Sequence, residues 1–333
     1  MQLSGPVCNE SKTVNYGPGS EAAARVLGAH VGTGEQMHAA LKASFAEVVA
    51  EIKAFSKKVA NTGLETAPIR HTAFRALKVN YLPRLTYLIQ HHPVSVTAEL
   101  AAEVDVALAQ SIADILALSD EERDHCEPQL RLPTNKGGFG FSALVETAPL
   151  QRLGTLVRSM QFVKEHLSVL APLEGETLPE ARELADHFLA KLDDTAVELK
   201  ADLVKLNEWN QGTLQPTEED LAAFHSLQRR LTERHHNAKR DAWIASFPKE
   251  DLEIRNRVHS IVAPETGRPL NVVTINVENH MWDQDFLYWV RHRLLIPLTP
   301  SGHRCVDTDT AIDPDLDHAF CCLKRGRRVM HSL

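Results

Sequence analysis

Cysteine and histidine side chains near the C-terminus have the types and spacing of a zinc site. Cys305, His318 and Cys322 supply three ligands, and three residues separate His318 from Cys322. Structural Zn²⁺ takes four Cys or His ligands in a tetrahedron, so one ligand is missing. The residues that could stand in for it are His303, Asp307, Cys321 and His331. We expect a degenerate zinc site here, with buried thiols and a capping histidine as the alternative.

Basic side chains gather in two places where they could neutralise phosphates and release counterions. The smaller cluster covers residues 324–328 and the larger one residues 229–240. The cations of the larger cluster that we single out are Arg229, Arg230, Arg234, Lys239 and Arg240. Because the whole chain has a formal net charge of -8, a nucleic-acid surface must be local. A solvated helix face explains the larger cluster equally well.

Paired carboxylates are the third set of residues with chemical potential. Asp193 and Asp194 are adjacent, and Asp313 and Asp315 flank a proline. Two-metal catalysis needs carboxylates that hold two ions close together. We assign the first pair to an acidic helix and the second to a loop, and we predict solvated charge in both places.

Apolar residues recur at spacings of three and four through much of the chain, which is typical of amphipathic helices. The first stripe predicts a helix of about seven turns and consists of Met37, Leu41, Phe45, Val48, Ile52, Phe55 and Val59. The second stripe consists of Val96, Leu100, Val104, Leu108, Ile112 and Ile115. Residues 67–92 predict two helices joined near residues 80–83, because Pro83 suits a first helical turn.

Glycines, prolines and charges mark the segments outside these helices. Residues 1–34 combine short apolar stretches with Gly-Pro turns, as short strands would. Residues 130–141 (LRLPTNKGGFGF) predict a loop with extended flanks and a tight turn that needs positive φ. Residues 173–220 predict an acidic, solvated helix with one apolar face. Residues 270–277 are rich in β-branched residues and could form a strand, whereas residues 286–295 predict a helix.

The composition limits the class of protein and its compartment. A length of 333 residues favours about two domains, and 43% hydrophobic with 24% charged residues is typical of a globular protein. The five cysteines are scattered without a disulfide framework. No segment approaches 18 uninterrupted apolar residues, and no secretory signal is recognised. We expect a nuclear or cytoplasmic protein without a membrane span, and the oligomeric state stays open.

Several strings resemble, in order, the region downstream of the active site in reverse transcriptases of non-LTR retrotransposons. Residues 9–13 (NESKT) resemble the segment after the catalytic strand, and residues 26–32 (VLGAHVG) resemble the hairpin that grips the primer end. Residues 82–88 (LPRLTYL) resemble a thumb string, and residues 132–149 resemble the stretch after the thumb. The strings that resemble a zinc-knuckle segment are 242–243, 291–294, Cys305, 317–322 and 325–326.

The resemblance implies a mainly α fold in five consecutive regions. They are a short β remnant of a polymerase palm (1–34), a helical thumb bundle (35–128), a Gly-rich loop with a connector helix (129–172), an acidic helical insert (173–224), and a mostly helical C-terminal region with a basic helix and a knuckle (225–333).

The resemblance also implies a polymerase whose catalytic aspartates lie outside this sequence, because it contains no Tyr-x-Asp-Asp string. Mg²⁺ would then belong only to the intact parent enzyme. Lys12 matches a lysine near the triphosphate and has nothing to act on without the aspartates. Thumb helices cradle template and primer, so Arg75, Lys78 and Arg84 are expected to contact phosphates. We expect an RNA- or DNA-binding fragment without polymerase activity, and the alternative is a helical protein–protein interaction scaffold.

Overall fold

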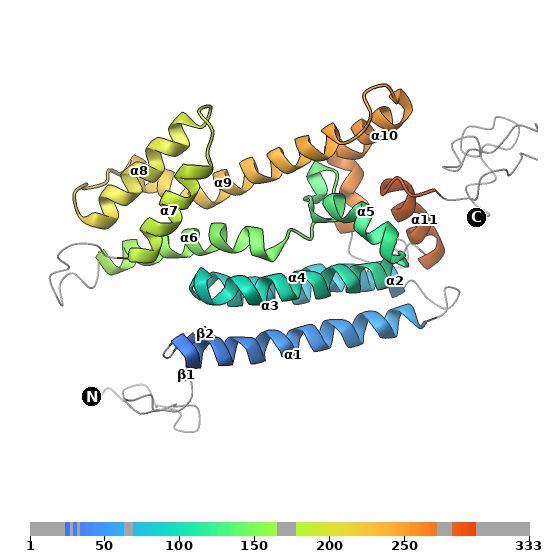
Figure 1. The fold of residues 1–333 in the computed structure, drawn as a ribbon, viewed down its shortest axis with the longest axis horizontal. Coiled ribbons are helices and arrows are strands. Elements are labelled where there is room, and N and C mark those ends of the chain that lie inside the picture. The colour runs from blue at the N-terminus through green and yellow to red at the C-terminus, as the bar shows by residue number, and fades with distance from the viewer. Residues whose placement is uncertain are drawn as a thin grey trace, which may run out of the picture. The chain divides into compact units, whose positions relative to one another are not determined.

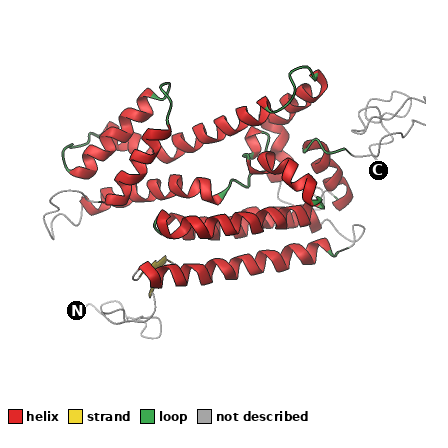
Figure 2. Ribbon diagram, viewed as in Figure 1, coloured by secondary structure: helices red, strands yellow, loops and turns green. Residues whose placement is uncertain are grey.

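The computed structural model describes residues 24–26, 29–31, 34–62, 69–164, 178–271 and 282–297. Helices account for most of these residues, so the predicted mainly α fold is confirmed (Figure 2). The α-helices are α1 (Gly34–Ala60), α2 (Ile69–Ala76), α3 (Leu82–Gln90), α4 (Val94–Leu116), α5 (Asp120–Arg131), α6 (Leu144–Phe162), α7 (Pro179–Lys191), α8 (Val197–Gln211), α9 (Glu218–Ala245), α10 (Leu252–Val262) and α11 (Asp283–Arg293) (Figure 1). A π-helix η2 (Leu77–Tyr81) and the 3₁₀ helices η3 (Thr134–Lys136) and η5 (Pro264–Asn271) join them.

Two short strands lie near the N-terminal end of the described part. β1 (Ala24–Val26) pairs antiparallel with β2 (Ala29–Val31), with Ala24 opposite Val31. Within the described residues these strands pair only with each other. An isolated hairpin of this size is marginal in water and gives no support to a palm remnant.

Contacts within the backbone divide the chain into two compact units made of alternating segments. Unit 1 comprises residues 1–49, 83–105 and 144–232, and unit 2 comprises residues 50–82, 106–143 and 233–333. Helices α1, α4 and α9 therefore contribute residues to both units. The five consecutive regions expected from the sequence stay a prediction.

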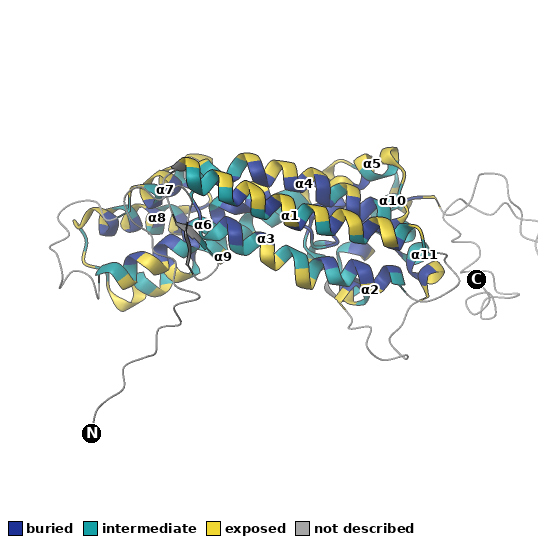
Figure 3. Ribbon diagram, turned by 90° about the horizontal axis from the view of Figure 1, so that it is seen from below, coloured by how far each residue is buried: buried dark blue, intermediate teal, exposed yellow. Residues whose placement is uncertain are grey.

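The two predicted apolar stripes form the buried faces of α1 and α4. Leu41 and Ile52 are almost fully buried on α1, as are Leu100 and Ile112 on α4. Figure 3 shows buried and exposed faces running along these helices. The helical periodicity predicted from the sequence is confirmed. No described helix is both long enough and apolar enough to cross a membrane.

Unit 1 has an apolar core between α6, α7, α8 and the first part of α9. Trp209 of α8 stacks on Phe224 of α9, with ring centroids 5.5 Å apart. The buried carboxylate of Asp105 accepts hydrogen bonds from the backbone N–H groups of Leu144 and Val145, at 2.8 and 3.0 Å. It thereby satisfies donors that the first turn of α6 leaves without a helical partner.

The acidic segment differs from the sequence prediction, because it forms two helices where one was expected. Asp193 accepts hydrogen bonds from the backbone N–H and the hydroxyl of Thr195, at 2.9 and 2.5 Å. Such a local side-chain bond competes with the helical ladder and favours a turn. The prediction that Asp193 and Asp194 lie within a helix is wrong, since they lie between α7 and α8. Both side chains are exposed, as expected of solvated charge.

The two helices predicted between residues 67 and 92 are joined by the π-helix η2, directly before Pro83. Both residues that flank η2, Ala76 and Leu82, keep right-handed helical dihedrals. The N–H of Leu82 donates to the carbonyl of Leu77, five residues earlier. Pro83 has no backbone N–H to donate, so widening the helical turn before it breaks no hydrogen bond from this residue. The helical backbone thus continues from α2 through η2 into α3.

The core of unit 2 is an aromatic cluster around Phe74 of α2. Its ring meets Phe139 and Phe141 edge-on at centroid distances of 6.0 and 5.0 Å, and Phe286 of α11 at 6.0 Å. Edge-to-face pairs of this kind add to the free energy gained by burial. The cluster fixes the Gly-rich loop, which carries two of these rings, against α2.

The Gly-rich loop turns tightly, as predicted. Gly137 and Gly140 have φ of +91° and +83°, a region that side chains other than glycine disfavour. A Cβ on Gly138 would lie 2.0 Å from the carbonyl oxygen of Leu132. The predicted extended flanks are wrong on one side, because α5 continues to Arg131.

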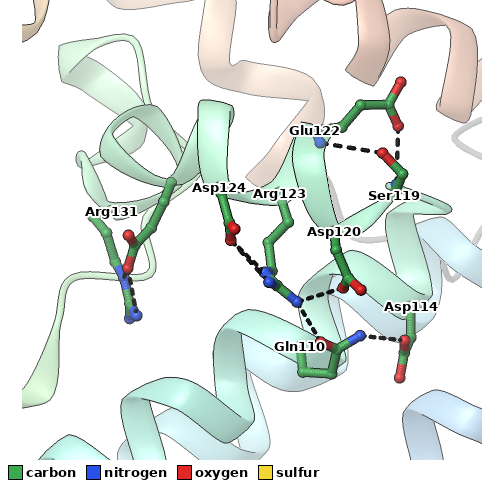
Figure 4. A network of polar contacts seen from close by, with 9 residues as sticks. Gln110, Asp114, Ser119, Asp120, Glu122, Arg123, Asp124 and Arg131 are labelled. Atoms are coloured by element: carbon green, nitrogen blue, oxygen red, sulfur yellow. Dashed lines mark hydrogen bonds and ion pairs between the residues drawn. The ribbon is translucent and has the colours of Figure 1, made fainter.

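Helix α5 begins at a capping box and is tied to α4 by polar contacts (Figure 4). The hydroxyl of Ser119 accepts from the N–H of Glu122, whose carboxylate accepts from the N–H of Ser119. Arg123 points toward Gln110 of α4 and pairs with Asp120 at 2.7 Å. These contacts position the helix that leads directly into the Gly-rich loop.

Candidate nucleic-acid interface

Lys78 is a cation of unit 2 with several close neighbours. It lies on η2 and is half-buried, with Nζ donating to Oδ1 of Asn271 at 3.0 Å. The ammonium lies 5.9 Å from the centroid of the Phe74 ring. A Cβ on Gly140 would lie 2.9 Å from Nζ, so a glycine there leaves room for the ammonium. Burial, followed by the charge of Arg75, lowers the Lys78 pKa from 10.5 to about 8.

Arg75 adds a second positive charge three residues before Lys78. Neither cation forms an ion pair with a carboxylate of the described residues. Two like charges that are partly desolvated without a counter-charge raise the free energy of the folded state. An anion bound between them would remove that cost.

The Gly-rich loop carries a third cation, Lys136, on the side of α9. Its Nζ pairs with a carboxylate oxygen of Glu233 at 2.6 Å. This hydrogen bond is the main reason why the pKa of Glu233 is lowered. This ion pair connects the Gly-rich loop to α9 through the carboxylate of Glu233.

His236 of α9 contacts the end of the same loop. Its Nε2 lies 3.2 Å from the hydroxyl of Ser142. Burial is the main cause that lowers the His236 pKa to about 4, and the charges of His235, Lys239 and Lys136 contribute. His236 is therefore neutral at physiological pH.

The interior side of the loop is fixed by polar side chains. Gln129 donates to the carbonyl oxygens of Gly137 and Arg293, at 3.1 and 2.8 Å. The buried guanidinium of Arg293 lies 5.8 Å from the Phe139 ring and donates to the Gly138 carbonyl at 3.4 Å. Burial lowers the Arg293 pKa to about 10. These interior contacts hold the Gly-rich loop in a fixed position.

The cations predicted on α9 divide into different environments. Arg230 pairs with Asp202 at 2.5 Å in unit 1, and Arg240 pairs with its neighbour Asp241 at 2.7 Å in unit 2. Arg229 is exposed and pairs with no described carboxylate. Three other residues were predicted to contact phosphates. Arg84 on α3 is exposed, and Arg234 and Lys239 on α9 are half-buried.

Trp243 packs in a second apolar cluster of unit 2 with Val258 and Ile261. Its ring is 8% exposed, which favours a role in packing over stacking on a base.

The remaining predicted site residues lie outside the described part of the chain. They are Lys12 and the proposed zinc ligands Cys305, His318 and Cys322. The described residues contain no group of three side chains able to hold a metal ion. Zinc binding at the C-terminus stays a prediction.

Four residues of the interface were not singled out from the sequence: Lys136, Ser142, His236 and Asn271. A lysine directly before two glycines is a signal that could have identified Lys136. Asn271 lies 193 residues from its partner Lys78, so no local pattern relates them.

Comparisons with protein-family models, with curated proteins and with solved structures gave no match.

Proposed function

We propose that this chain binds duplex nucleic acid, with Arg75 and Lys78 of unit 2 contacting the phosphates. The observation that carries the proposal is the pair of partly desolvated cations without a described carboxylate partner. Helix positions three apart are about 5–6 Å from each other, so both side chains can reach one strand. Phosphate contacts supply most of non-specific affinity. Lys136 of the loop is paired with Glu233 and therefore adds little positive charge to this site.

The order of the matched strings supports a further part of the proposal, that the parent is a retrotransposon reverse transcriptase. In that setting the duplex is template and primer, and α2, η2 and α3 belong to the thumb. The sequence has no Tyr-x-Asp-Asp string, and we propose that the chain alone does not polymerise. Zn²⁺ at Cys305, His318 and Cys322 belongs to the same proposal.

The test is fluorescence anisotropy with a labelled RNA–DNA hybrid and a double variant, Arg75→Gln with Lys78→Gln. Losing two phosphate contacts is expected to weaken binding at 0.1 M salt by about tenfold or more. The matched control carries Lys53→Gln and Lys249→Gln, which remove two exposed lysines of unit 2. Its affinity should stay within about twofold of the original, because these lysines lie outside the proposed contacts.

Equal affinities of the two double variants would contradict the assignment of the site. If the original chain binds neither hybrid nor DNA duplex, the alternative of a helical interaction scaffold replaces this proposal.

A further inference from the structure

Unit 2 contains a cavity that is lined by none of the proposed phosphate contacts. Its volume is about 660 Å³, and sites that take small organic molecules usually measure about 300–1,000 Å³. The lining residues come from α5, from α9 and α10 with the turn between them, and from the segment that ends and follows α11. All of them belong to unit 2. The cavity therefore has room for one small organic ligand.

Much of the cavity wall is aromatic or aliphatic. Trp243 and Phe247 line it and meet edge-on, with ring centroids 5.4 Å apart. Ile254 and Leu295 also line it, and both are half-buried. Burial is the main cause that raises the pKa of the Cys126 thiol to about 12, so this side chain faces a ligand as a neutral group. Such a wall favours an aromatic ligand, whose ring can pack against the two indole and phenyl rings.

Leu295 shows that part of this wall is retained against the local preference of the backbone. Its φ is +58°, in the left-handed region that leucine rarely adopts. The N–H of Ile296 donates to the carbonyl of Arg291 at 2.9 Å, which is the helix end at which glycine usually takes the left-handed position. Glycine would relieve the backbone but would remove a side chain from the cavity wall. Strained residues of this kind are often found at ligand sites.

The polar lining residues differ in what they can offer a ligand. Gln129 donates to two main-chain carbonyl oxygens, and the hydroxyl of Ser246 donates to a third at 2.7 Å. Arg257 of α10 and the exposed His125 of α5 also line the cavity. Among the described residues that line it, none is an aspartate or a glutamate. A guanidinium keeps its positive charge and matches the geometry of a carboxylate, so the charge of this wall favours an anionic group.

We infer that this cavity binds a small aromatic carboxylate. The aromatic ring packs against Trp243 and Phe247, and the carboxylate pairs with Arg257. A small hydrophilic anion gains nothing from the apolar wall, and an uncharged aromatic molecule gains nothing from the charge. The inference goes beyond nucleic-acid binding and does not depend on it, because the two sites share no residue.

The experiment is isothermal titration calorimetry of the full chain with naphthalene-2-carboxylate and with naphthalene-2-carboxamide, its neutral analogue of the same shape. We expect the carboxylate to bind with a Kd below about 1 mM, as a well-placed ligand of this size should. The amide should bind about tenfold more weakly, because it lacks the charge-assisted contact with Arg257. This comparison uses the unaltered chain, so it stands even where a variant fails to fold.

Three variants locate the ligand. Arg257→Gln should weaken binding of the carboxylate about tenfold and leave the amide within about twofold. Arg255→Gln is the matched control, since it removes another arginine of α10 that is not among the lining residues, and it should change neither affinity. Ile254→Trp should weaken both ligands, because the larger side chain fills part of the cavity.

Three results would each overturn the inference: no binding of the carboxylate, equal affinities for carboxylate and amide, or equal affinities of the Arg257 and Arg255 variants for the carboxylate. Arg257→Gln should also bind the RNA–DNA hybrid as the original chain does. Failure of the cavity and failure of nucleic-acid binding are therefore told apart.

Discussion

His236 of the candidate interface makes the stability of the folded chain depend on pH. In the folded chain burial and nearby cations lower its pKa to about 4, whereas an unfolded histidine titrates near 6.5. The unfolded chain therefore takes up this proton first as the pH falls. The stability that a neutral His236 contributes is complete above about pH 7 and is lost as the pH falls toward 4.

We predict that His236→Gln reduces the loss of stability on acidification. Between pH 7 and pH 5 the original chain should lose about 1 kcal/mol more than the variant, a value discounted for partial exposure. Urea unfolding at both pH values measures the difference. His225→Gln, at an exposed position of the same helix, is the control and should behave as the original does.

The sequence predicted Arg75, Lys78 and the Gly-rich loop through the resemblance, and the structure brings Lys78 and the loop together. The sequence alone could not predict that Arg230 and Arg240 form ion pairs with carboxylates. One partner, Asp202, lies 28 residues away on α8, and the pairing depends on packing that no local pattern encodes. Clusters of basic residues therefore overstate the charge available to a ligand.

At the scale of elements, the Gly-rich loop is the part that positions the interface. Its backbone approaches Leu132 so closely that a Cβ on Gly138 would lie 2.0 Å from the carbonyl oxygen. The contact is with main chain, so it cannot be relieved by turning a side chain. The loop conformation therefore depends on glycine at this position.

We predict that Gly138→Ala lowers the free energy of unfolding by about 3 kcal/mol, as overpacking against backbone does. Gly212→Ala is the matched control, since nothing lies within 4 Å of its Cβ and only the φ of +80° opposes it. That control should cost about 1 kcal/mol. Denaturant titration measures both, and equal losses would contradict the close approach.

Helix positions were more predictable than helix breaks. The stripes of α1 and α4 follow from spacing alone, because burying one face of a helix imposes a period near 3.6. The break at Asp193 escaped prediction because apolar residues continue at helical spacing on both sides of it. Just after α7, Asp193 accepts two hydrogen bonds from Thr195, a local contact that the spacing of apolar residues does not reveal.

At the scale of the whole molecule, a negative net charge and a positive binding surface coexist. The net charge is -8, and acidic side chains such as Glu183, Asp186 and Glu198 are exposed on α7 and α8 of unit 1. The cations of the proposed site belong to unit 2. Interactions between exposed charges are screened at physiological salt beyond about 8 Å, so the charges close to a bound phosphate decide binding.

The most direct test of phosphate binding by Arg75 and Lys78 is the salt dependence of affinity for an RNA–DNA hybrid. Phosphate contacts by at least two cations predict that the logarithm of the association constant falls with the logarithm of salt concentration, with a slope of about -2 or steeper. A slope near zero, or no binding at low salt, would contradict the account.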